Sequence, residues 1–496
     1  MWHQVYAPVG GSIALSALVA AIPVFALLLA LGVFHLPAWK ASLAGLIAAA
    51  GVALLAYGMP ASLLVSSFLY GAAFGLFPIG WIVFAAILLY RITVETGQFE
   101  IIKDSVGGLT SDKRLQALLI AFAFGAFIEG ASGFGTPVAV AAAMLTGLGF
   151  TPFYAAAICL LANTAPVAFG AIGIPVITLA GLTNLPLRDL SANVGRICAP
   201  VSLFIPAYLV NVMGGWKAVR AVFPAVLVCG VSFAGTQFVV SNYFGPYLTD
   251  ILGSLIAIVC LVILLRFWHP RDRDEAQGPA PPVARHKGVE ILRAWAPYGL
   301  LVVFVSLWGW DPIKQWLNLA TRNVAWPALH NQILRVAPAV AKPTPYAAMY
   351  ALNLLSAAGT SCFFAAICSA LLLRMSCGRF MRLLAGATRQ LLVPLLTIAM
   401  VLGLAYLMNY SGATATLGLA FAATGVLFPF FSALLGWLGV FLTGSDTSAN
   451  ALFGNLQVVT ATSLHLNPTL MAAAKERAFP PVCARQRFRR VAEIHD

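Results

Sequence analysis

Two acidic side chains lie deep within apolar sequence, and they are the first candidates for chemistry. Glu129 follows the run GAFI, and Asp446 follows GVFLTGS. Ionisable groups inside membrane-spanning segments are costly to bury, and they commonly serve transport. A carboxyl in low-dielectric surroundings can take up a proton near neutral pH. We therefore predict that Glu129 and Asp446 are proton-coupling residues. The alternative for each is a neutral acid that is bonded to a break in the backbone.

Three breaks rich in Gly, Ser, Thr and Asn interrupt the apolar sequence, at residues 132–137, 163–166 and 445–450, and the one at 163–166 continues into a broken stretch at 170–175. Such residues permit turns and cap new helices, whose unpaired N–H groups attract an anion. The alternative is a set of kinks that neighbouring helices satisfy. On the first interpretation, the breaks form one site for a small carboxylate at the membrane midplane. The candidate substrate-binding residues are Ser132, Gly133, Gly135, Thr136, Asn163, Thr164, Ser445, Thr447, Ser448 and Asn450.

The expected helix starts are at about Pro137, Pro166 and Asn450, with Thr447, Ser448 or Asn450 as the cap in the third break. Arg196 is a further candidate, because it stands in a mostly apolar stretch and Arg binds carboxylates in bidentate fashion. It could equally extend toward the membrane surface or pair with Asp189.

The composition requires these residues to be positioned by membrane helices. Hydrophobic residues make up 61% of the 496 residues and charged residues 9%, against about 45–50% and about 25% in soluble domains. We predict an all-α polytopic membrane protein of about 12 transmembrane helices, with inverted repeats and broken or re-entrant helices at the midplane. The net charge of +13 comes from bases in short loops, which is typical of cytoplasmic loops and gives no indication of nucleic-acid binding. No nucleotide-binding GxxxxGK[ST] loop or metal-ligand spacing indicates a cofactor.

A weak internal repeat organises the chain. Residues 125–133 (GAFIEGASG) resemble residues 439–447 (GVFLTGSDT), and each copy continues to a proline and an alanine triplet. We predict a transport domain over residues 1–474, with repeats at about 79–213 and 390–474 and a cytoplasmic loop at about 268–293. Residues 346–373 are expected to form one span, and residues 311–345 an interfacial stretch.

The longest motifs resemble those of the bacterial L-lactate permease family. They are GAFIEGASGFGTPV at 125–138, NTAPVAFGAIGIP at 163–175 and GWLGVFLTGSDTSANALFGNLQ at 436–457. The resemblance covers about residues 1–474. It implies a secondary carrier that takes up lactate, and often glycolate, with protons across the bacterial inner (plasma) membrane. The residues that it implicates are Glu129, Gly130, Ser132, Gly133, Asn163, Thr164, Asp446, Thr447 and Asn450. No enzymatic activity is expected, and the oligomeric state stays open.

The C-terminal segment departs from this family. Residues 475–496 form a basic tail where the family pattern and the internal repeat both predict a second broken segment. A frameshift or truncation is the favoured interpretation, and a genuine short variant is the alternative. Two other functional hypotheses therefore stay open: a truncated member that does not transport, and a Na⁺-coupled carrier of small monocarboxylates. A membrane-embedded enzyme that uses Glu129 and Asp446 as an acid pair is a third and weaker one.

Overall fold

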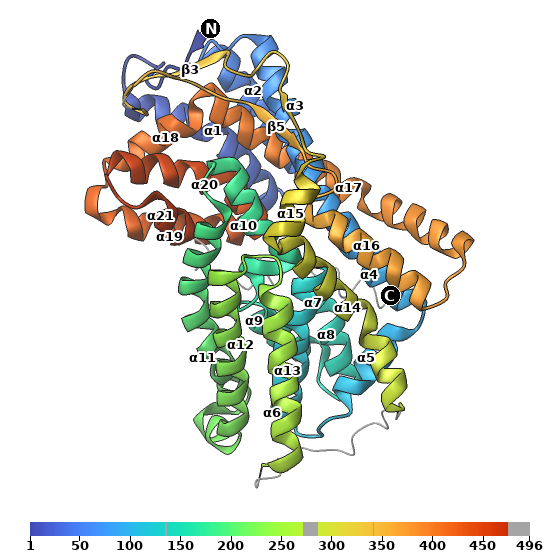
Figure 1. The fold of residues 1–496 in the computed structure, drawn as a ribbon. Helices are drawn as coiled ribbons and strands as arrows, with labels where there is room; N and C mark the ends of the chain where they lie inside the picture. Colours follow the sequence, from blue (N-terminus) through green and yellow to red (C-terminus); the bar gives the residue numbers. More distant parts are fainter. Residues whose placement is uncertain (134–135, 271–285, 341, 475–496) are drawn as a thin grey trace.

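The computed structural model describes residues 1–133, 136–270, 286–340 and 342–474, and helices dominate it (Figure 1). The prediction of an all-α membrane fold is confirmed. Within the described residues, ten helices are long and apolar enough to cross a membrane, or eleven if one bent pair counts as a span, close to the expected number of about 12.

The ten candidate spans include several continuous runs of two or three labelled elements. They are α1 (Ile13–Gly32), α2 (Ala38–Leu55), α3 (Ala61–Phe74) with η1 (Gly75–Gly80) and α4 (Trp81–Glu95), α6 (Lys113–Gln116) with η2 (Ala117–Phe124) and α7 (Gly125–Ala131), α11 (Leu187–Ala221), α12 (Phe223–Tyr243), α13 (Thr249–Phe267), α14 (Gly288–Gly309), α17 (Cys377–Ser411), and η4 (Gly425–Leu427) with α19 (Phe428–Thr443).

The bent pair consists of α9 (Pro152–Ala162) and the run of η3 (Val167–Phe169) and α10 (Gly170–Thr183), which meet at 71°. The remaining helices fall outside this count, most of them because they are short. They are α5 (Gln98–Gly107), α8 (Thr136–Gly147), α15 (Asp311–Asn318), α16 (Ala358–Leu372), α18 (Ala413–Ala422), α20 (Asp446–Ser463) and α21 (Pro468–Ala474).

Two small sheets form around the segment between α15 and α16, and the N-terminal strand joins one of them. The strand β1 (Trp2–His3) pairs in parallel with β3 (Ile333–Arg335), which pairs antiparallel with β4 (Thr344–Pro345). The strand β2 (Arg322–Ala325) pairs antiparallel with β5 (Met349–Leu352). Because β5 takes up this pairing, the helix begins only at Ala358, and the expected span over residues 346–373 is wrong.

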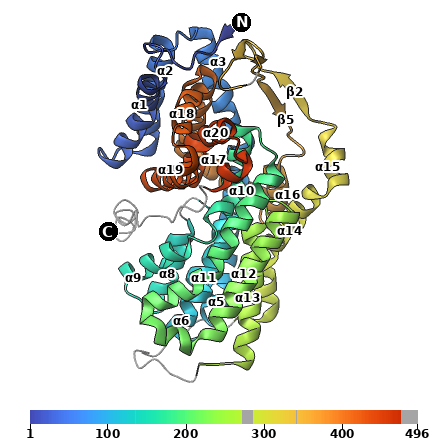
Figure 2. The same cartoon turned by 90° about the vertical axis from the view of Figure 1, so that its left-hand side faces the viewer.

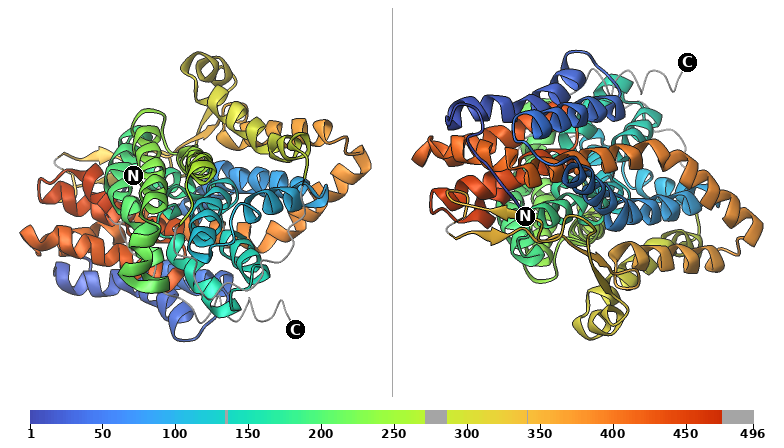
Figure 3. Two further views of the ribbon diagram at one scale, coloured as in Figure 1. Left: turned by 90° about the horizontal axis from the view of Figure 1, so that it is seen from below. Right: turned by 90° about the horizontal axis from the view of Figure 1, so that it is seen from above.

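The helix α10 lies at the centre of the packing. It contacts α7 and α13 on one side and α20 on the other, and Figure 2 shows it between the C-terminal helices and the group α11 to α13. The helices α11, α12 and α13 pack side by side in the lower part of Figure 1. The N-terminal helix α1 packs against α18 and α19, so that the blue N-terminal and the orange-red C-terminal helices lie side by side (Figure 3).

The order of features in the two repeat copies is visible in the structure. In the first copy α7 breaks into α8, and α9 begins at Pro152; in the second, α19 breaks into α20, and α21 begins at Pro468. Each break contains a glycine with positive φ, Gly133 at +57° and Gly444 at +65°. The inverted relation of the copies and their limits, 79–213 and 390–474, stay predictions. The tail at 475–496 and residues 271–285 of the loop at 268–293 lie outside the described residues.

Candidate functional site

The first break separates α7 from α8 and carries four of the predicted residues. The run that ends in α7 is enclosed by protein along its whole apolar window, so Glu129 and Ser132 are only 8% and 1% exposed. The Ser132 hydroxyl donates to the carbonyl of Ile128 at 3.0 Å, which closes the last turn of α7. The next helix begins at Thr136, within one residue of the expected start. Gly135 lies outside the described residues.

The helix α10 contains a further break just after its start, within the stretch 170–175 that the sequence predicts to be broken. Ala171, Ile172 and Gly173 are all in the left-handed region, with φ of +46°, +59° and +76°. Residues with a Cβ rarely adopt this conformation, and those that do commonly lie at functional sites. Regular helical geometry therefore resumes only near Pro175.

The first break rests directly on this break in α10. A Cβ at Gly133 would meet the Ala171 Cβ at 2.7 Å, and a Cβ at Gly170 would meet the Glu129 Oε1 at 2.5 Å. Glycine at both positions therefore permits the close approach of the two segments. The Glu129 carboxyl lies against the backbone at the start of α10.

The break at residues 445–450 separates α19 from α20 and is called the second break from here on. It is capped differently from the prediction. Ser445 is the N-cap, and its hydroxyl accepts a hydrogen bond from the Ser448 N–H at 3.3 Å. Asp446 is the first residue of α20 and is 7% exposed. The expected helix start at about Asn450 and the expected caps are therefore wrong. Ser445 takes the cap because its hydroxyl reaches a free N–H of the first turn.

Asn450 instead connects the second break to α10. Its side-chain Nδ2 donates to the Pro175 carbonyl at 2.9 Å, and the side chain is fully buried. Pro175 lies two residues after the last left-handed residue of α10, Gly173. Both breaks thus contact the same short segment, residues 170–175, from opposite ends.

A small cavity of about 40 Å³ lies at the start of α20. Its polar lining comes from three predicted residues, Ser445, Thr447 and Ser448. Its apolar lining comes from α20, α10 and α17, through Ala451, Ile174, Ile398, Val401 and Leu402. A cavity of this size holds about three water molecules. The structure therefore brings hydroxyl groups and a helix N-terminus together in a partly enclosed space.

Asn163 and Thr164 lie at the joint between α9 and η3, and both are half-buried. Asn163 ends α9 as its C-cap, and only the short turn η3 follows Pro166. The expected regular helix start at Pro166 is therefore wrong, because the left-handed residues delay it. The neighbouring carbonyl of Ala165 accepts a hydrogen bond from the Gln237 Nε2 at 3.1 Å.

Arg196 lies outside this assembly. It is exposed on α11, and its Nε donates to the Asn242 Oδ1 at 2.8 Å. The structure thus pairs Arg196 with a neighbouring helix, not with Asp189 and not with the breaks.

Asp250 is an acid at the site that the sequence analysis missed. It lies in the first turn of α13 and is 1% exposed. A Cβ at Gly130 would meet the Asp250 Cβ at 2.9 Å, so the acid lies directly beside α7. In sequence, Asp250 follows a Gly-Pro turn at the edge of an apolar run, where acids usually face water. Only the long-range packing of α13 on α7 shows that it is buried.

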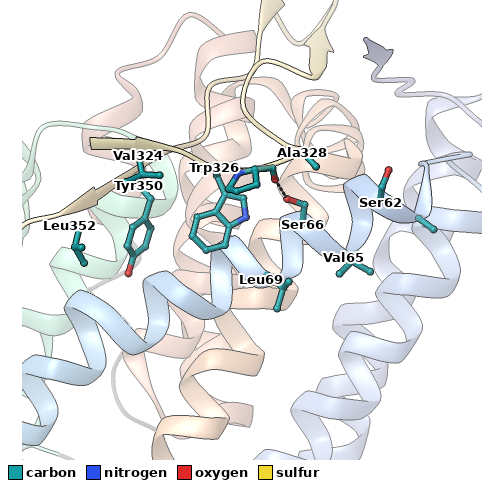
Figure 4. Close-up of a pocket in the computed structure, with 11 residues that line it drawn as sticks. Ser62, Val65, Ser66, Leu69, Val324, Trp326, Ala328, Tyr350 and Leu352 are labelled. Carbon is teal, nitrogen blue, oxygen red and sulfur yellow. Dashed lines mark hydrogen bonds between the residues drawn. The ribbon is translucent and has the colours of Figure 1, made fainter. Parts of the chain in front are cut away.

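A much larger cavity lies elsewhere. It has a volume of about 840 Å³ and lies between α3 and the β2–β5 hairpin (Figure 4). Trp326, Tyr350, Val65 and Leu69 line it, and Ser66 donates to the Pro327 carbonyl at its wall. None of the predicted site residues lines this cavity. Its mostly apolar wall suits a small anion poorly.

Comparison with known proteins finds relatives along most of the chain. Residues 16–478 match the family described as L-lactate permease. The chain is 45% identical to an L-lactate permease of Bacillus subtilis and 45% identical to the glycolate permease GlcA of Escherichia coli. Each alignment covers 95% of this chain and 88% of the relative. It is also 41% identical to an L-lactate permease of Escherichia coli, over 96% of this chain and 88% of the relative.

Proposed function

This chain belongs to the L-lactate permease family, and from that premise we propose that it takes up lactate and glycolate with protons across the bacterial inner membrane. The names of its relatives support the two substrates, and the ten or eleven apolar helices of the described residues support a multi-pass membrane protein. The observation that carries the proposed site is the meeting of two broken helices on one segment of α10. A hydroxyl-lined cavity lies beside it.

The substrate carboxylate binds at the start of α20. The first N–H groups of a helix carry a partial positive charge, and α20 is long enough to develop this dipole. The Thr447 and Ser448 hydroxyls line the same cavity and can hydrogen-bond the 2-hydroxyl that lactate and glycolate share. Specificity for short 2-hydroxy acids follows from the apolar wall of Ile174, Val401 and Leu402, which leaves little room for a longer chain.

A proton accompanies the substrate because acids border the site. Asp446 shares the first turn of α20 with the anion site, and Glu129 lies on the other side of the α10 segment. An ionised carboxylate repels the substrate anion in a low-dielectric interior, and a proton on that carboxyl removes the repulsion. Proton uptake and substrate binding therefore favour each other.

Transport requires this site to open. At about 40 Å³ the cavity holds only a few water molecules, so the described conformation is a closed one. Carriers with broken helices expose a midplane site to each side in turn by moving one group of helices against another. The cavity lies between α20, α10 and α17, so opening must separate these helices.

Uptake by proteoliposomes tests this function. The full chain is reconstituted, and accumulation of radiolabelled L-lactate is measured under an inward proton gradient, with and without a proton ionophore. We expect accumulation that the ionophore abolishes and that excess glycolate inhibits. Accumulation that follows a Na⁺ gradient and ignores the ionophore would favour the Na⁺-coupled alternative. A folded protein that neither accumulates nor exchanges lactate would contradict the proposal.

A further inference from the structure

We propose that Asp250 and Glu129 form one buried carboxyl pair and that this pair holds the coupled proton. The inference rests on the proposed proton symport and deepens it, because it assigns the proton to the side of α10 that faces α7 and α13. Asp446 then belongs to the anion site at the start of α20.

Close packing brings the two carboxyl-bearing segments together. The backbone of α13 at residue 251 and the Cβ of Asp250 would lie 3.0 and 2.9 Å from a Cβ at Gly130, the residue after Glu129. Asp250 therefore lies beside α7 within one residue of Glu129, and both acids are buried in the same region. Two like charges that share a buried site are not ionised together without a large cost, so such a pair favours holding one proton.

The side chain of Gln237 on α12 is an independent indication of a proton. It is 0% exposed and lies beside the Asp250 carboxyl. Its Nε2 donates to the Ala165 carbonyl, whereas its Oε1 and both Asp250 carboxyl oxygens have no hydrogen-bond partner in the described structure. An ionised Asp and an amide oxygen are both acceptors only. A protonated Asp250 can donate to the Gln237 Oε1, which satisfies both groups.

The helices that pack against α13 in the described structure carry few charged groups. Among α7, η2, α10 and α12, which pack against α13, the only Asp, Glu, Lys, Arg or His is Glu129. The other titratable groups on these helices and on α13 are Cys229, Tyr243 and Cys260, with Tyr247 just before α13. Arg266 on α13 is 16 residues from Asp250, about 24 Å along the helix.

The pair is connected to the anion site through α10. The Glu129 carboxyl lies against Gly170, and the Pro175 carbonyl, five positions further on, accepts from Asn450 of α20. Between these two contacts lie the left-handed residues Ala171 and Ile172. A change in the charge of the pair therefore acts on the same short segment that bounds the substrate cavity.

The test separates the movement of lactate from its coupling to protons. Asp250→Asn is reconstituted, and two rates are measured: proton-driven accumulation of L-lactate and the exchange of external for internal lactate without a gradient. Exchange needs the substrate site but no net proton transfer. We expect accumulation to fall about tenfold or more, because the amide binds no proton, and exchange to stay within about threefold of the unmodified protein.

Asp189→Asn serves as the matched control, because Asp189 is also in the first turn of a long helix but is exposed. It should leave both rates unchanged. Full accumulation by Asp250→Asn would overturn the proposal. Loss of both rates in a folded Asp250→Asn protein would also overturn it, because that result assigns Asp250 to substrate binding. If the unmodified protein itself neither exchanges nor accumulates lactate, the proposed function fails instead.

A measurement on the unmodified protein covers the case in which Asp250→Asn does not fold. Dicyclohexylcarbodiimide reacts with protonated carboxyls in apolar surroundings, and peptide mapping locates the label. We expect the reagent to label Asp250 or Glu129, and this labelling to decline as the pH is raised. Accumulation of L-lactate should be lost in proportion to the labelling. Labelling that falls on Asp446 and spares both members of the pair would overturn the assignment.

Discussion

The two breaks differ in how they treat polar groups, although both interrupt an apolar helix at a glycine with positive φ. The first, between α7 and α8, is enclosed: Glu129, Ser132 and the neighbouring Asp250 are all buried. The second, between α19 and α20, also holds one buried acid, Asp446, but adds a capped helix start and a cavity lined by half-buried hydroxyls. An enclosed carboxyl favours a proton, whereas a helix start with hydroxyls favours an anion. We therefore assign the coupled proton to the first break and the substrate anion to the second.

The largest effect is expected at the enclosed break. Glu129→Gln keeps the size of the side chain but removes its ability to exchange a proton. Accumulation of L-lactate under a proton gradient should fall about tenfold or more in reconstituted vesicles, whereas lactate exchange persists. The control is Glu95→Gln, which removes an exposed carboxyl that pairs with Arg379. Wild-type accumulation by Glu129→Gln would remove Glu129 from the coupling mechanism.

The next largest effect is expected at the second break, between α19 and α20. It should change the KM for L-lactate. Thr447→Val keeps the shape of the side chain but removes a hydroxyl from the cavity lining. The KM for L-lactate should rise about tenfold, because a hydrogen bond to a charged or strongly polar ligand contributes about 1.5–3 kcal/mol. Thr462→Val near the exposed end of the same helix is the matched control. A Thr447→Val protein with an unchanged KM would place the substrate elsewhere.

A smaller effect is expected where the two breaks are joined. Asn450→Leu leaves the buried Pro175 carbonyl without its side-chain donor, which costs about 1–3 kcal/mol. The Tm of the purified protein, followed by intrinsic fluorescence, should fall, and added lactate should raise it less than in the unmodified protein. If the Tm and its response to lactate are both unchanged, Asn450 does not couple α20 to α10.

The smallest effect is expected at Arg196. Its guanidinium contacts Asn242 on the exposed face of α11, away from both breaks. Because Arg196 does not line the cavity, Arg196→Gln should alter the KM by no more than about twofold. As an exposed substitution it should also change the free energy of unfolding by less than about 0.5 kcal/mol. A large rise in the KM would restore Arg196 as a ligand for the substrate carboxylate.

The sequence predicted the elements that depend on local chemistry. The apolar composition predicted the all-α fold, and the Gly, Ser and Thr breaks predicted the interruptions near Gly133 and Ser445. It also placed the start of α8 within one residue, because Thr followed by Pro is a strong helix-start signal. The hydroxyls of Ser445, Thr447 and Ser448, chosen from the sequence, line one cavity in the structure.

What the sequence missed depends on contacts between distant segments. The sequence predicted a break at 170–175, but not that Ala171 and Ile172 take the left-handed conformation, because neither residue favours it; Ala171 packs closely against Gly133. Asp250 stands beside a Gly-Pro turn and is typical of a span end, yet the approach of α13 to Gly130 buries it. Asn450 resembled a helix cap but serves as a donor to α10.

Binding of L-lactate to the purified variants tests the division between the two breaks most directly. Isothermal titration is performed on the unmodified protein, Glu129→Gln and Thr447→Val under one set of conditions. The account predicts that Glu129→Gln binds L-lactate within about threefold of the unmodified protein, whereas Thr447→Val binds about tenfold more weakly. The reverse order, with binding lost in Glu129→Gln and retained in Thr447→Val, would contradict it.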